Sequence, residues 1–142
     1  MTRHCFTYGS LMWADIMARV CGREFASEPA SLADHQRHPV RGQDYPGLRI
    51  AAGGLVPGRL YLDVTEEAWA RLDAFEGAEY ERADIVVALA DGRTLSAQVY
   101  RFRAEVADRL LPGDWDAEAF AREGRQRFIA RYVGFEVLNS RQ

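Results

Sequence analysis

Two short segments of the sequence hold residue types that could do chemistry. The first, Tyr8-Gly9-Ser10-Leu11, follows a short apolar run and precedes an amphipathic one. A turn that joins a strand to a helix leaves backbone N–H groups without partners, and such groups bind a carboxylate or an oxyanion. The same residues also fit a plain tight turn with a capping serine, and they lack the spacing of the glycine-rich nucleotide fingerprints. Both interpretations are open on the pattern alone.

The second segment is LDAFEG at residues 72–77, in which Glu76 precedes a glycine that would end a helix. The negative end of a helix raises the pKa of a carboxyl group placed there, and partial burial beside Phe75 would act in the same direction. A carboxyl group that titrates near neutral pH suits general acid–base catalysis. The alternative is a solvent-facing glutamate in an acidic stretch of the chain.

Further charged residues follow on a predicted strand. On such a strand Glu79 and Glu81 face away from Tyr80 and Arg82, so a converging pair of carboxylates with Glu76 is not expected. Arg82 could neutralise Glu76 or contact an anionic ligand. A surface salt bridge explains Arg82 equally well.

Hydrophobic periodicity indicates which elements must position these residues. Alternating apolar residues predict strands at residues 4–8, 30–36, 58–64, 79–89 and 94–102. Helical spacing predicts helices at residues 11–20, 66–76 and 116–132. A long loop is expected through residues 45–47. Together these elements predict an α+β fold, in which a mostly antiparallel sheet or small barrel carries flanking helices.

Composition narrows the chemistry that the chain can perform. It has 142 residues, a formal net charge of −3, and 18 arginines without a single lysine. The lack of lysine excludes Schiff-base and pyridoxal-phosphate lysines, the phosphate-loop lysine and the kinase lysine. Without a basic excess, neither nucleic acid nor a membrane surface is expected as a partner.

Cysteine and histidine are too sparse to indicate a metal centre. The two cysteines and three histidines have no recognisable ligand spacing, so no metal is expected. Cys5 and His4 are adjacent on a strand and point to opposite faces, which argues against a nucleophile–base pair. With no apolar leader and no membrane-length apolar run, we expect one cytoplasmic domain over residues 1–142. Residues 103–142 are interpreted as its C-terminal helical extension.

Four runs of the sequence, taken together, resemble the gamma-glutamylcyclotransferase-like superfamily. They are the YGSL turn at residues 8–11, Tyr-Pro-Gly at 45–47, LDAFEG at 72–77 and Tyr-Glu-Arg at 80–82. Within the superfamily, the pattern is most similar to the avirulence-induced-gene and gamma-glutamylamine cyclotransferase branch. The resemblance spans roughly residues 4–102. The region after it resembles, with less specificity, extensions of some plant and bacterial members.

The resemblance implies a small β-barrel with flanking helices and a cavity between the YGSL turn and Glu76. It implies that Glu76 is the catalytic acid–base. It also implies substrate-binding positions at Tyr8, Gly9, Ser10, Leu11, Tyr80 and Arg82. The Tyr80 and Arg82 pair is expected to be partly structural.

The implied substrate is a small γ-glutamyl compound that cyclises to 5-oxoproline and releases an amine or an amino acid. Because the substrate's own α-amine is the nucleophile, such an enzyme has to fold the substrate and move protons, without a cofactor. A non-catalytic small-ligand-binding or regulatory protein on the same fold is the alternative. The leaving amine and the choice between monomer and homodimer stay open.

Overall fold

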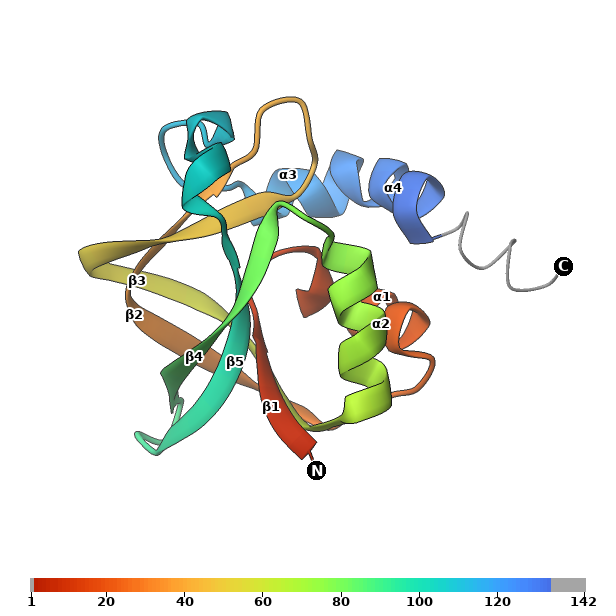
Figure 1. Ribbon diagram of the computed structural model, residues 1–142, viewed down its shortest axis with the longest axis vertical. Helices are drawn as coiled ribbons and strands as arrows, with labels where there is room; N and C mark the ends of the chain where they lie inside the picture. The colour runs from red at the N-terminus through yellow and green to blue at the C-terminus, as the bar shows by residue number, and fades with distance from the viewer. Residues whose placement is uncertain (1, 134–142) are drawn as a thin grey trace, which may run out of the picture.

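The computed structural model describes residues 2–133 and has five strands arranged as a closed barrel. The strands are β1 (Thr2–Thr7), β2 (Ser27–Pro39), β3 (Pro46–Thr65), β4 (Tyr80–Leu89) and β5 (Thr94–Phe102). Around the barrel they follow the order β1-β3-β2-β4-β5 (Figure 1). Neighbouring strands are antiparallel except β1 and β5, which pair in parallel. The predicted α+β class with a small, mostly antiparallel barrel is confirmed.

Helices cover one side of this barrel. Helices α1 (Ala14–Cys21) and α2 (Glu66–Glu76) pack against each other, and the C-terminal helical segment lies near the upper end of α2 in Figure 1. That segment is continuous from α3 (Ala117–Ala119) through a π-helical turn, α4 (Arg125–Phe128) and a second π-helical turn. Two short 3₁₀ helices are η1 (Ser10–Met12) and η2 (Ala104–Arg109). Within the described part of the chain, no helix is both long and apolar enough to span a membrane.

Two apolar cores hold the fold together, one inside the barrel and one between the barrel and the helices. Strand alternation divides β1 between them, so Phe6 lies in the barrel core and Cys5 packs on the helix side. Cys5 is fully buried, and this burial raises the pKa of its thiol well above the usual value. A thiol in such surroundings is inert, so Cys5 is a packing residue.

Local sequence signals place α2 where the periodicity predicts it. The Thr65 side chain accepts a hydrogen bond from the Ala68 N–H at 3.2 Å and so caps the helix. Trp69 and Leu72 are buried on the face toward the barrel. Gly77 ends the helix at φ +78°, a conformation that disfavours side-chain-bearing residues. Glu76 is therefore the last residue of α2.

The long hairpin of β2 and β3 differs from the prediction. Residues 46–57, expected to lie in and after a long loop, belong to β3, which pairs with β2 from Ser27↔Tyr61 to Pro39↔Pro46. Midway, β3 advances from Ile50 to Leu55 while β2 advances only from Ala33 to His35. This bulge breaks the apolar alternation and bends the hairpin, so the sequence pattern does not indicate a strand there.

The helix predicted at residues 11–20 is also interrupted. Residues 10–12 form η1, Trp13 is extended, and α1 begins only at Ala14. Near the C-terminus the helical prediction for residues 116–132 agrees with the structure. The rest of the expected extension, residues 134–142, lies outside the described residues.

Candidate active site

A pocket opens where the chain leaves β1 and where α2 ends. It holds about 550 Å³ of empty space, its open mouth included. Residues 7–11 form one wall, and Glu76 lies in another. Aromatic and proline side chains supply the rest of the lining: Phe6, Tyr45, Pro46, Phe75, Tyr80, Tyr100 and Phe128. The two segments that sequence analysis singled out therefore meet in one cavity, although α1, β2 and β3 lie between them in the chain.

Glu76 is the only charged side chain among the described residues that line this pocket. Burial raises the pKa of Glu76 from the usual 4.5 to about 8, and the nearby Asp73 carboxylate acts in the same direction. Within residues 2–133, no group donates a hydrogen bond to the Glu76 carboxyl or forms an ion pair with it. A desolvated carboxyl group of this kind can take a proton from a bound ligand and return it.

The raised pKa of Glu76 predicts a pH-dependent stability. Between about pH 4.5 and 8 the folded state holds a proton on Glu76 that the unfolded chain has released, so stability falls as pH rises through this window. We expect Glu76→Gln to remove this loss. Relative to the variant, the wild type should lose about 1–3 kcal/mol between pH 5 and 8.5. Urea unfolding at both pH values measures the difference, and parallel pH profiles for the two proteins would contradict it.

A buried arginine fixes the start of the turn at residues 8–11. Arg37 of β2 is 8% exposed, and its Nη1 donates to the Tyr8 carbonyl at 2.8 Å. Its Nε donates to Asp114 at 2.8 Å. On the other side of Tyr8, the phenol donates to the Tyr100 carbonyl of β5 at 2.6 Å. These bonds tie the turn to β2 and β5, and the loop before α3 anchors the arginine.

The turn itself is closed by η1 and not by a full α-helix. The Met12 N–H donates to the Gly9 carbonyl at 3.0 Å, and the Leu11 carbonyl accepts from the Tyr61 hydroxyl at 2.7 Å. The sequence predicts a helix from residue 11, but α1 begins only at Ala14, so no α-helix dipole acts directly at this turn. The backbone N–H groups of the turn are then the candidate donors for an anion.

Gly9 allows the turn to contact the opposite side of the pocket. A Cβ at Gly9 would lie 2.7 Å from both Cγ and Cδ of Pro46, well inside van der Waals contact. Pro46 is held in turn by the Tyr80 hydroxyl, which donates to its carbonyl at 2.7 Å. A larger residue at position 9 would therefore push the turn away from β3.

The two remaining predicted site residues, Tyr80 and Arg82, differ in their relation to the pocket. Tyr80 is buried and lines the pocket. Arg82 does not line it: its Nη2 lies 3.5 Å from Asp73 Oδ2, and its guanidinium lies 4.8 Å from the Trp69 ring centroid. Arg82 therefore contacts Asp73 and Trp69 of α2 and does not line the cavity. As alternate residues of β4, Tyr80 and Arg82 are on the same face of the strand, but the pocket extends along that face only as far as Tyr80.

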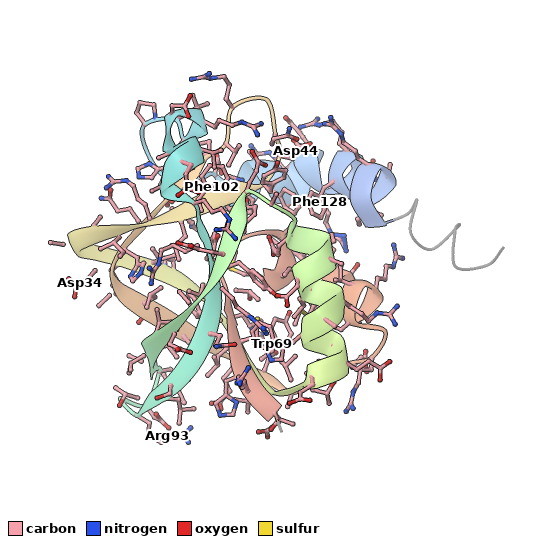
Figure 2. The ribbon with its side chains drawn as sticks, viewed as in Figure 1. Asp34, Asp44, Trp69, Arg93, Phe102 and Phe128 are labelled. Carbon is pink, nitrogen blue, oxygen red and sulfur yellow. The ribbon has the colours of Figure 1, made fainter. Side chains whose placement is uncertain are left out.

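Sequence reasoning did not identify several walls of the pocket. Tyr45 belongs to the Tyr-Pro-Gly motif that carries the family resemblance. Its hydroxyl donates a 3.2 Å hydrogen bond to Glu79 Oε1, a contact that only the folded chain reveals. Tyr100 and Phe128 come from β5 and α4, and only the folded chain brings them to the pocket. Figure 2 shows Phe128 near the upper end of α2, with Asp44 close by. The described residues contain no cluster of metal-binding side chains.

Comparison with protein families identifies the group to which the chain belongs. The family model described as gamma-glutamyl cyclotransferase, AIG2-like, matches residues 5–117. The chain belongs to this family. The match includes the pocket turn and Glu76, whereas most of the C-terminal helical segment follows it.

Individual relatives of the AIG2-like family agree with this assignment. AIG2-like protein D of Arabidopsis thaliana is 32% identical over 137 residues, which cover 94% of this chain and 90% of that protein. A solution structure of an A. thaliana protein is 27% identical with a TM-score of 0.71, and the match covers 90% of this chain and 86% of that one. A solved structure named gamma-glutamyl cyclotransferase shares the fold, with a TM-score of 0.65, 17% identity and coverage of 72% and 68%. Family and fold are therefore gamma-glutamyl cyclotransferase-like.

Proposed function

We propose that this protein is a gamma-glutamylcyclotransferase that converts a γ-glutamyl compound into 5-oxoproline and a free amine or amino acid. The observation that carries the proposal is the pairing of Glu76 with the turn at residues 8–11 in one aromatic pocket. The substrate's α-amine attacks its own γ-carbonyl, so the protein contributes positioning and proton transfer. Membership of a family described as gamma-glutamyl cyclotransferase supports the same reaction.

Glu76 is the proposed acid–base because its carboxyl group is desolvated and has no hydrogen-bond or ion-pair partner within residues 2–133. Before a substrate binds, the raised pKa of Glu76 keeps the carboxyl group mostly protonated near neutral pH. A substrate α-ammonium bound beside it stabilises the ionised form and so lowers that pKa. The carboxylate then accepts a proton from the ammonium, which frees the amine to attack the γ-carbonyl.

Glu76 also completes the reaction in this scheme. It returns the proton to the nitrogen of the scissile amide, and the C–N bond breaks as the amine leaves. The new ring nitrogen then gives its extra proton to the carboxylate, which leaves neutral 5-oxoproline nitrogen and a protonated Glu76. One residue can serve both steps because its pKa lies close to the working pH.

The turn at residues 8–11 is the proposed anion holder. Its backbone N–H groups would bind the α-carboxylate of the glutamyl portion or the oxyanion that forms on the γ-carbonyl. Arg37 and Tyr100 hold Tyr8 in place, so these donors are positioned before substrate arrives. The aromatic walls limit the access of water, which strengthens hydrogen bonds inside the pocket.

The experiment that tests the function is incubation with a panel of γ-glutamyl amino acids and γ-glutamyl amines. Mass spectrometry follows 5-oxoproline and the released amine, which should appear in equal amounts. The matched controls are the α-glutamyl isomers, which cannot release that amine by forming the same ring. Binding without turnover would favour the non-catalytic ligand-binding alternative. Neither binding nor turnover for any member of the panel would reject the proposal.

A further inference from the structure

Asp73 lies one helical turn before Glu76 on α2, so the two carboxyl groups share a face of the helix. Residues at this spacing have Cβ atoms about 5–6 Å apart. Two hydrogen-bonding or ionic contacts orient Asp73. Its Oδ1 accepts from the Tyr100 hydroxyl at 2.7 Å, and its Oδ2 lies 3.5 Å from Arg82 Nη2.

Arg82 reaches Asp73 from outside the pocket. It comes from β4, and its guanidinium stacks over the ring of Trp69 on α2. Its side chain is 29% exposed and that of Asp73 is 48% exposed, so solvent weakens the ion pair without removing it. The contact connects β4 to the last two turns of the helix that carries Glu76.

The other titratable groups around Glu76 are thiols and phenols, which are uncharged near pH 7. They are Cys5 of β1, Tyr8 directly after β1, Cys21 of α1, Tyr45 before β3, Tyr80 of β4 and Tyr100 of β5. More distant charges are matched in pairs, Glu79 with Arg109 and Asp15 with Arg125. Helix α4, which brings Phe128 to the pocket, also has Arg127, and this arginine pairs with Asp44. Among the described charged groups, Asp73 is the one that raises the pKa of Glu76, and Arg82 is the ion-pair partner of Asp73.

We propose that Asp73 and Arg82 are positioning residues that set how tightly Glu76 holds its proton. Asp73 disfavours a second negative charge one turn away, while Arg82 partly neutralises Asp73. The raised pKa of Glu76, to which Asp73 contributes, agrees with this arrangement. This inference rests on the proposed function for its meaning in catalysis, but the electrostatic coupling exists without it. It also gives Arg82 a role at the site without substrate contact.

Two substitutions that break the same ion pair should shift the titration midpoint of Glu76 in opposite directions. Asp73→Asn removes the negative charge and keeps an oxygen that can accept the Tyr100 hydrogen bond. The midpoint of the Glu76 titration should fall by about 0.5–1 pH unit. Arg82→Gln removes the positive charge, so the midpoint should rise by about 0.3–0.5 unit. Arg82→Lys keeps the charge and should leave the midpoint near that of the wild type.

The measurement is a ¹³C NMR titration of the full chain labelled at glutamate side chains, with the Glu76 signal identified by its loss in Glu76→Gln. The titration measures protonation of the Glu76 carboxyl group directly. It therefore tests the electrostatic coupling to Asp73 and Arg82 even if the substrate panel shows no turnover. With a substrate, the acidic limb of kcat/KM against pH should move with each midpoint.

An unchanged midpoint in Asp73→Asn, or shifts of the same sign in Asp73→Asn and Arg82→Gln, would overturn the inference. A purely structural role predicts loss of stability with no such opposite shifts. If Arg82→Gln does not fold, Asp73→Asn and Arg82→Lys still test the inference. The inference then requires a lowered midpoint in Asp73→Asn and a wild-type midpoint in Arg82→Lys.

Discussion

Replacing Glu76 with glutamine is expected to lower kcat by about 10²–10⁴-fold on the γ-glutamyl substrate, because the amide cannot accept the ammonium proton. Glutamine has nearly the same shape as a protonated glutamate, the form that the raised pKa of Glu76 favours before a substrate binds. The fold and the binding of a substrate should therefore survive. Steady-state formation of 5-oxoproline and calorimetric titration with the substrate measure the two quantities separately.

Glu67→Gln is the matched control for this change. Glu67 is exposed in the first turn of the same helix, far along the axis from the pocket, and the chemical substitution is identical. It should retain wild-type kcat. A Glu76→Gln enzyme with near-normal kcat would show that Glu76 is not the acid–base.

Replacing Gly9 with alanine is expected to lower kcat/KM by about 10²-fold, because a Cβ at this position meets the Pro46 ring at 2.7 Å. Either the turn or the start of β3 has to move, and both line the pocket. Forcing one carbon into a filled space should also lower the free energy of unfolding by about 1–3 kcal/mol. Kinetics and urea unfolding measure the two effects.

The steric cause of the Gly9→Ala effect can be isolated with a double-mutant cycle. Pro46→Ala removes the two ring atoms that the new Cβ would meet. The double variant should therefore recover part of the activity lost in Gly9→Ala, beyond what Pro46→Ala alone shows. Independent, additive losses in the two single variants would mean that the contact with Pro46 is not the reason for glycine at this position.

Elements with local signals were predictable from the sequence, whereas residues 46–57 of the long β2–β3 hairpin were not. Helix α2 has a capping threonine at one end and Gly77 at the other, and both act within one turn of the chain. In β3, the pairing of residues 46–57 depends on contacts with β2 across a bulge. A bulge shifts the side-chain alternation, so no periodic pattern records that pairing.

The position of Glu76 at the end of α2 follows from the sequence alone, because Gly77 next to it ends the helix. The turn at residues 8–11 likewise follows from the end of an apolar strand. Only the tertiary structure decides that these two segments share a pocket and that Phe128 closes part of it. It also decides that Arg82 binds Asp73 and does not face the cavity. Caps and turns act between neighbours in the chain, whereas burial and ion pairing depend on distances between residues that only the closed barrel and its helices bring together.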